Sequence, residues 1–260
     1  MYDIAKRTAF GAGILLILPV AVGLSGWQWQ PETQGLWLRG LFWVTETVTR
    51  PWGIVTSALL ALWFLWCLRF RFKPALGVLA IMALTVLVGQ GMKSFIKERL
   101  QEPRPFVVWL EKTYQVDERY FYSLPRPERA RLVAEQLSAQ TQIPEWLRAH
   151  WQFETGFAFP SGHTLFAATW ALLAVGLLWA RRHYKTVVVL MVWASGVMAS
   201  RLALGMHWPQ DLIAATLMSW VLVVLACTVA QRWCGPLTLL PQETQSDDDD
   251  ANQGHKGPLP

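Results

Sequence analysis

Six long apolar stretches, separated by polar segments, divide the first 235 residues of the chain. Each is long enough to cross the hydrocarbon layer of a bilayer, which is about 30 Å thick and takes roughly 20 residues of helix. The pattern predicts an all-α integral membrane protein with six transmembrane helices, over approximately Thr8–Trp27, Gly53–Phe70, Ala75–Phe95, Gly162–Ala180, Thr186–Leu204 and Asp211–Trp233.

Composition and charge placement support this interpretation. Only 16% of the residues are charged and 53% are hydrophobic, whereas soluble domains average about 25% charged residues. Lysine and arginine concentrate on the cytoplasmic side of membrane proteins. Because basic residues gather at alternate ends of the six stretches, we expect both chain termini in the cytoplasm. The ends concerned carry Lys6, Arg7, Arg69, Arg71, Lys73, Arg181, Arg182, Lys185 and Arg232.

The segment between the third and fourth stretches is long enough to form a domain outside the membrane. We expect a small helical periplasmic cap over about residues 98–158, within a membrane domain of residues 1–235. Pro127 and Pro144 are suited to open two of its helices. The second helix has a Trp-rich face, which either rests on lipid headgroups or packs within the cap. The acidic segment 236–260 predicts a disordered cytoplasmic tail.

Polar residues stand at the ends of three of the stretches, all on the side away from the cytoplasm. In the first group, Lys97 and Arg104 are seven residues apart, so a continuous helix would direct both to one side. The prolines at 103 and 105 make this helix end irregular and able to turn Arg104 toward a pocket. Two cations directed at one point suit a phosphate, although ordinary membrane-flanking charge is the alternative.

The second group is Pro160-Ser161-Gly162-His163, at the start of an apolar stretch. Ser161 is suited to be the N-cap of the helix. Gly162 would allow an oxyanion to approach the first free backbone N–H groups, and His163 would lie in the first turn. The alternative is a plain helix cap followed by an interfacial histidine.

The third group runs from Ser200 to Asp211 and contains Arg201 and His207. Its turn is short, so Arg201, His207 and Asp211 must lie close together. A carboxylate within reach of a histidine fixes the ring's orientation and makes one ring nitrogen nucleophilic. The alternative is that Asp211 only caps a helix, while Arg201 extends its side chain to the membrane interface.

Together the three groups predict a phosphoryl-transfer site without metal. Lys97, Arg104 and Arg201 would neutralise the phosphoryl oxygens. A zinc site built from His163, His207 and Asp211 is conceivable, but the nearby cations would repel a dication. We assign His207 as nucleophile, Asp211 as the group that orients it, and His163 as general acid and base. Of these two histidines, only His207 has a carboxylate four residues away, and only His163 lies beside the expected anion-binding helix start.

The three groups resemble the motifs of the type 2 phosphatidic acid phosphatase family, Lys-x6-Arg-Pro, Pro-Ser-Gly-His and Ser-Arg-x5-His-x3-Asp, without departure. The resemblance implies the same residue roles, a location in the bacterial inner membrane with a periplasmic active site, and activity without a cofactor. It also implies lipid substrates: phosphatidylglycerophosphate, phosphatidic acid, lysophosphatidic acid, diacylglycerol pyrophosphate and undecaprenyl pyrophosphate. We expect no nucleic-acid partner and no obligate protein partner beyond the bilayer. The rivals are a lipid-phosphate transporter and a structural membrane protein without a site.

Overall fold

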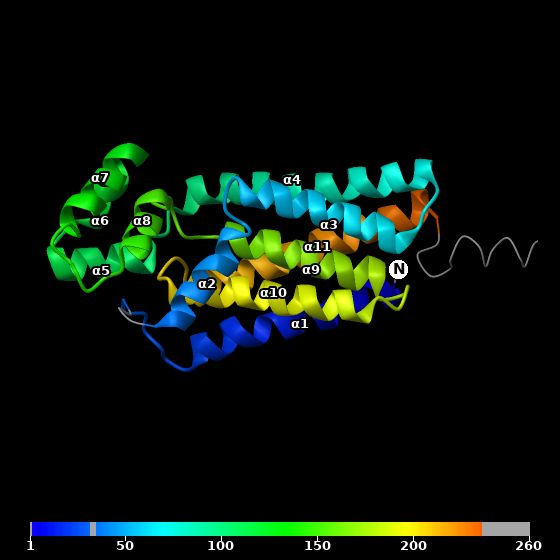
Figure 1. Ribbon diagram of the computed structural model, residues 1–260, viewed down its shortest axis with the longest axis horizontal. Coiled ribbons are helices and arrows are strands. Elements are labelled where there is room, and N and C mark those ends of the chain that lie inside the picture. Colours follow the sequence, from blue (N-terminus) through cyan, green and yellow to red (C-terminus); the bar gives the residue numbers. More distant parts are fainter. Residues whose placement is uncertain (1, 32–34, 236–260) are drawn as a thin grey trace, which may run out of the picture.

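The computed structural model describes residues 2–31 and 35–235, and within these ranges the chain is entirely helical (Figure 1). The predicted tail at 236–260 lies outside the described residues. The helices are α1 (Tyr2–Leu24), α2 (Leu36–Glu46), α3 (Trp52–Leu68), α4 (Phe72–Leu100), α5 (Pro105–Tyr114), α6 (Glu118–Ser123), α7 (Arg126–Gln136), α8 (Glu145–Phe153), α9 (Gly162–Leu178), α10 (Tyr184–Ala203) and α11 (Pro209–Trp233).

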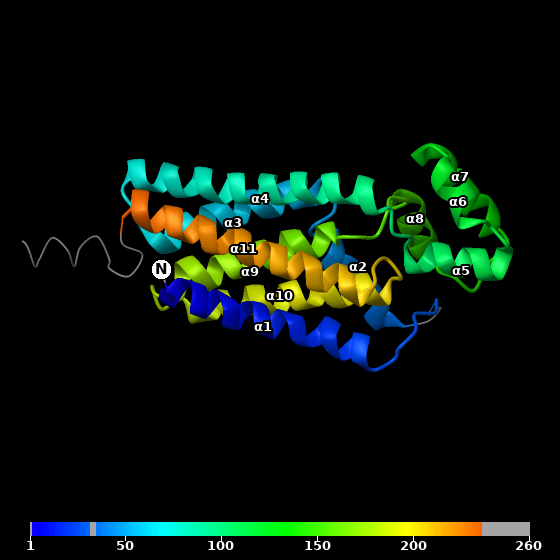
Figure 2. The same ribbon diagram turned by 180° about the vertical axis from the view of Figure 1, so that it is seen from behind.

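Six long helices run side by side along the long axis of the molecule: α1, α3, α4, α9, α10 and α11 (Figures 1 and 2). Each overlaps one of the six predicted stretches, although the ends differ: α1 begins six residues earlier and ends three residues earlier than predicted. Four of them, α1, α4, α10 and α11, have the length and composition to cross a membrane. The other two, α3 and α9, are apolar helices of 17 residues each, or about 25 Å.

Helix α9 lies at the centre of the bundle and packs against the five other long helices. Its residues from Thr164 to Leu178 are all buried, which explains why the sequence is apolar on every side of this helix. The outer helices instead expose large apolar side chains, among them Trp63 and Trp66 on α3. Such an outward-facing apolar surface suits contact with lipid.

Helices α5 to α8 form a cap at one end of the bundle, whereas the N-terminal end of α1 and the last turn of α11 lie at the other end (Figures 1 and 2). The predicted cap helices are present: α7 begins at Arg126 and α8 follows its N-cap, Pro144. Short helices α2, α5 and α6 were not predicted.

The Trp-rich face of α8 packs inside the cap. Leu147 and Trp151 are buried, and the Trp151 ring stacks on Phe106 with centroids 5.5 Å apart. The headgroup interpretation is therefore wrong for Trp151, and the alternative of packing within the cap is right.

The premise of a continuous helix through Arg104 is also wrong. Helix α4 ends at Leu100, and Gln101 after it adopts the left-handed conformation. Arg104 is extended and precedes α5, whose first residue is Pro105. The irregular turn predicted from the prolines is thus present, and it directs Arg104 back toward the bundle.

Candidate active site

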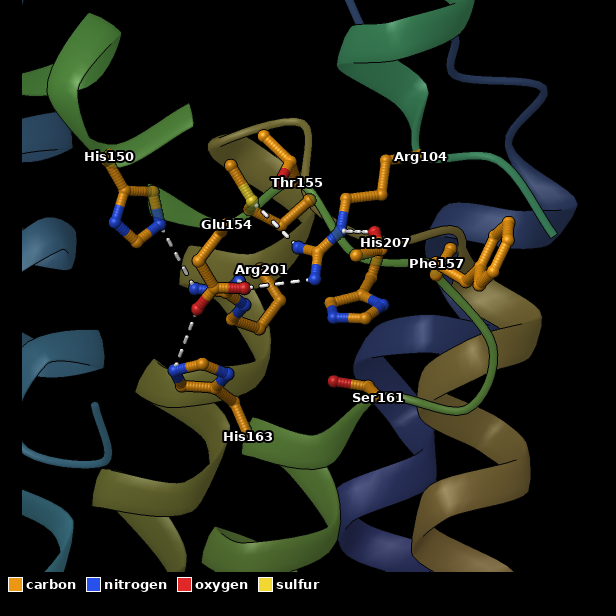
Figure 3. Close-up of polar contacts among 12 residues, drawn as sticks. Arg104, His150, Glu154, Thr155, Phe157, Ser161, His163, Arg201 and His207 are labelled. Atoms are coloured by element: carbon orange, nitrogen blue, oxygen red, sulfur yellow. Dashed lines mark hydrogen bonds and ion pairs between the residues drawn. The ribbon is translucent and has the colours of Figure 1, made fainter. Parts of the chain in front are cut away.

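The three polar groups meet where the cap joins the bundle, and backbone hydrogen bonds link them. The Ser161 N–H donates to the carbonyl of Asp211 at 3.3 Å, which connects the start of α9 to α11. The Phe106 N–H donates to the carbonyl of Gly205 at 3.0 Å, which connects α5 to the turn between α10 and α11. Residues far apart in sequence therefore share one site (Figure 3).

His207 and Asp211 form the predicted pair. The Nδ1 atom of His207 donates to Oδ2 of Asp211 at 3.0 Å, and the same oxygen accepts the backbone N–H of Trp208 at 2.9 Å. Both side chains are buried. Since Oδ2 already accepts the Trp208 N–H, we assign the proton of the His207–Asp211 hydrogen bond to Nδ1, and Nε2 then keeps its lone pair.

The pKa of His207 lies well below its usual value. Burial is the main cause, and the positive charges of Arg104 and Lys97 lower it further. The ring is therefore neutral near pH 7, as a nucleophile must be.

Tryptophans that the motifs did not predict hold the turn that carries His207. The indole N–H of Trp29 donates to the carbonyl of Ala203 at 2.8 Å, and that of Trp151 donates to the carbonyl of Leu204 at 2.9 Å. Gly205 has a φ of +70°, and a Cβ there would lie 2.4 Å from the Trp29 ring. The only sequence signal for Trp29 and Trp151 was the high tryptophan count of the chain, which a preference for membrane interfaces also explains.

Glu154 lies between the predicted phosphate-binding groups (Figure 3). Its Oε2 is 3.0 Å from Nη2 of Arg104 and 3.1 Å from Nη2 of Arg201, and its Oε1 is 3.4 Å from Nε2 of His163. A carboxylate thus occupies the position where these three groups would meet a phosphate. Sequence reasoning missed Glu154; the only available signal was an acidic residue shortly before the Pro-Ser-Gly-His motif.

The pKa of Glu154 is well below the usual carboxyl value. Burial alone would raise it, but the charges of Arg201, His163 and Arg104 outweigh that effect. Glu154 is therefore an anion bound to buried cations, and its contacts mark this position as an anion site.

The two arginines are buried within further polar contacts. Arg104 donates through Nε to the carbonyl of Gly156 at 2.6 Å and through Nη1 to the sulfur of Met206 at 3.0 Å. Arg201 donates through Nη1 to Oγ1 of Thr45, on the unpredicted helix α2, at 3.0 Å. Both side chains are buried. This burial disfavours the alternatives of flanking charge for Arg104 and of an arginine extending to the interface for Arg201.

His150 also contacts Arg201, accepting from its Nη1 at 3.3 Å. Burial and the charge of Arg201 lower the pKa of His150 to about 3. The ring is therefore neutral, and its Nδ1 faces Oε1 of Glu46 at 3.8 Å. The arginine is thus held by α2 and α8 together.

Lys97 lies beside the site but contacts a different segment. Its amino group donates to the carbonyls of Phe157 and, at 3.1 Å, Ala158. These contacts hold the loop that leads from Glu154 to α9. Lys97 is therefore placed to fix this loop next to the anion position.

Ser161 caps α9 as predicted, accepting the Thr164 N–H at 3.3 Å. Its hydroxyl points toward His207 (Figure 3). A side chain at Gly162 would collide with Lys93, whose Cδ would be 2.6 Å from the new Cβ. A larger residue at this position would therefore require the Lys93 side chain to move, and the approach of an oxyanion to Gly162 stays a prediction. In the part of the chain that the structure describes, no group of three or more His, Cys, Asp or Glu residues could hold a metal ion.

The family model of the PAP2 superfamily matches residues 74–234, a span that contains all three motifs. The chain is 61% identical over 245 residues to phosphatidylglycerophosphatase B of Escherichia coli (strain K12), covering 94% of this chain and 96% of that protein. It is 37% identical over 227 residues to phosphatidylglycerophosphatase B of Haemophilus influenzae, covering 84% and 92%. The family resemblance seen in the motifs is confirmed, and this chain belongs to the PAP2 superfamily.

Proposed function

We propose that this chain is a membrane lipid phosphatase that acts through a phosphohistidine intermediate. The observation that carries the proposal is the His207–Asp211 pair beside an anion position formed by Arg104, Arg201 and His163. A site that only bound a lipid phosphate would not need an oriented, neutral histidine. This favours hydrolysis over the transporter alternative, and the buried polar network disfavours a purely structural protein.

In the first step, the phosphoryl group replaces the Glu154 carboxylate between Arg104 and Arg201. The lone pair on Nε2 of His207 attacks phosphorus, and the bond from phosphorus to the lipid oxygen breaks. His163 acts in this step as the imidazolium: it gives its Nε2 proton to that oxygen and becomes neutral. In the second step, His163 takes a proton from water, whose oxygen attacks phosphorus and releases His207 and phosphate.

We assign the phosphate contacts to Arg104, Arg201, Ser161 and the backbone at Gly162, and to Lys97 once its amino group turns from the carbonyls of Phe157 and Ala158 toward the phosphate. The arginine forks suit phosphoryl oxygens. Both relatives described above are named as phosphatidylglycerophosphatases. On that likeness we propose phosphatidylglycerophosphate as a substrate, together with phosphatidic acid, lysophosphatidic acid, diacylglycerol pyrophosphate and undecaprenyl pyrophosphate.

Phosphate release from these lipids tests the proposal directly. The purified protein in detergent is expected to release phosphate in the presence of excess chelator, because arginine and lysine side chains neutralise the phosphoryl oxygens. Vanadate is expected to inhibit, because it adopts the five-coordinate shape of the transferring group. Loss of activity on chelation, restored by magnesium or zinc, would overturn the assignment.

We further propose that the six long helices cross the bacterial inner membrane, with both termini cytoplasmic and the site periplasmic. Ser138, exposed on the cap, is then accessible from the periplasm, whereas Arg71, exposed before α4, is not. In cells with a permeabilised outer membrane, Ser138→Cys is expected to react with an impermeant thiol reagent and Arg71→Cys only after lysis. The three native cysteines are buried, which keeps the background low. The reverse pattern would contradict the topology.

Glu154→Gln is expected to lower the melting temperature of the unliganded protein. It leaves Arg104 and Arg201 buried without a counter-charge, and breaking a buried ion pair costs about 3–5 kcal/mol. Vanadate should raise the melting temperature of this variant more than that of the wild type, because it supplies the missing anion. Glu135→Gln, an exposed change on the cap, is the control.

The stabilisation by Glu154 should also depend on pH. Its pKa is depressed in the fold, so its contribution is present above the usual value of 4.5 and lost as the pH falls below it. The free energy of unfolding of the wild type should therefore fall as the pH drops below 4.5. The free energy of unfolding of Glu154→Gln should fall less over the same range. Equal acid sensitivity of the two proteins would count against the anion-site interpretation.

A further inference from the structure

Thr49 makes a side-chain contact with His163 from outside the three motifs. It lies in the segment between α2 and α3, and its Oγ1 is 3.1 Å from Nε2 of His163. The side chain is only 6% exposed, so water does not compete freely for this contact. The same Nε2 faces Glu154 at 3.4 Å. Two acceptors thus face the nitrogen that points into the phosphate site.

The hydroxyl proton of Thr49 has other acceptors. Oγ1 donates to the backbone carbonyl of Thr45 at 3.3 Å. A hydrogen bond with Thr49 also opposes the rise that burial causes in the pKa of Glu46. A hydroxyl has one proton and two lone pairs. With its proton directed at these acceptors, the Thr49 oxygen is free to accept from Nε2–H of His163.

The segment that carries Thr49 is itself held in place. Oγ1 of Thr47 accepts the indole N–H of Trp193 on α10 at 3.0 Å, and its carbonyl accepts from Thr56 on α3 at 2.7 Å. The carbonyl of Thr49 accepts the Gly53 N–H at 2.9 Å. Thr49 is therefore a fixed point beside the His163 ring.

We propose that Thr49 is a positioning residue for His163: its oxygen shares Nε2–H with the leaving oxygen of the substrate in a three-centre hydrogen bond, and so keeps the ring at the phosphate site after the substrate displaces Glu154. The contact with Glu154 is lost at that moment, and the Thr49 contact is the one that remains on the same nitrogen. When the proton passes to the lipid oxygen, the hydroxyl can rotate and donate to the Nε2 lone pair. Thr49 would then pair with His163 before and after proton transfer.

This inference rests on the proposed function, since it requires His163 to be the general acid. It predicts a defect that depends on the leaving group. A lipid alcohol needs protonation as it leaves, whereas nitrophenolate does not. Thr49→Val, which is close in size and lacks the hydroxyl, should therefore slow phosphatidic acid hydrolysis more than 4-nitrophenyl phosphate hydrolysis.

The experiment measures kcat/KM on both substrates for wild type, Thr49→Val, Thr49→Ser, His163→Ala and the double variant Thr49→Val/His163→Ala. For Thr49→Val, the fall in kcat/KM should be roughly 3- to 10-fold larger on phosphatidic acid than on 4-nitrophenyl phosphate, which corresponds to the loss of one hydrogen bond. Thr49→Ser should stay close to wild type because it keeps the hydroxyl. Thr49→Val should add nothing once His163 is alanine, because the two changes act through one group.

Thr8→Val on α1 is the matched control, since Thr8 is buried and its hydroxyl bonds only to carbonyls of its own helix. If Thr49→Val does not fold, Thr49→Ala removes the same hydroxyl. Equal losses on the two substrates, failure of serine to rescue, or a further loss in the double variant would each overturn the positioning role. If His163→Ala shows leaving-group dependence and Thr49→Val does not, only the Thr49 inference is wrong. If His163→Ala shows no such dependence, the general-acid assignment falls, and the role of Thr49 with it.

Discussion

His207→Ala is expected to abolish turnover and phosphoenzyme formation together. Nε2 of His207 is the proposed attacking atom, because the ring is neutral and its Nδ1 is hydrogen-bonded to the Asp211 carboxylate. Removal of a catalytic nucleophile typically costs on the order of 10⁴-fold or more in turnover. Binding of vanadate should survive in part, because Arg104 and Arg201 remain.

Asp211→Asn is the matched comparison for the nucleophile. It should cost less than His207→Ala, because it misorients the imidazole without removing it. Acid quench followed by mass spectrometry, on a variant slow in the second step, would locate the phosphate. Phosphate found on His163 or on Ser161 would show that the roles are wrong even though the family is right.

His163→Ala is expected to slow hydrolysis of a lipid phosphate by about 10²–10⁴-fold, the usual contribution of a general acid. The loss should be much smaller with a nitrophenyl ester, since its leaving group departs without a proton. His163 lies in the first turn of α9, and its Nε2 faces the position now held by Glu154. The measurement is kcat/KM for both substrates, with melting temperatures as a check on folding.

His183→Ala is the control for loss of a histidine. His183 precedes α10 at the other end of the bundle, where its Nε2 contacts the carbonyl of Cys67 at 3.2 Å. It should show no difference between the two substrates. A His163→Ala variant that lost both activities equally would instead point to a role in binding or folding.

Much of the architecture was predictable from local pattern. Six apolar stretches correspond to six long helices, because burying backbone polar groups in an apolar setting requires continuous helical hydrogen bonding. The N-cap at Ser161 and the start of α11 at Pro209 were also predictable, since capping and proline preferences act within one turn. The His207–Asp211 pair was also predictable, because a spacing of four residues brings the two side chains close together.

The short helices were harder to predict. Helix α2 is apolar but only 11 residues long and has no side-chain cap, and its end near Thr45 is stabilised by a tertiary contact with Arg201. The premise of a helix that continues from Lys97 to Arg104 was also wrong, because α4 ends at Leu100. The nearby prolines restrict the helix, but they do not fix where the chain turns.

The sequence by itself determined the helical class, the family and the set of groups able to handle a phosphate, because each is written in residue type and local spacing. Tertiary structure alone decided that Glu154 occupies the anion position, that Thr49 reaches His163 and that tryptophans hold the turn before His207. These contacts join residues separated by up to 174 positions. No local periodicity encodes them, because they depend on how the cap, α2 and the bundle pack together.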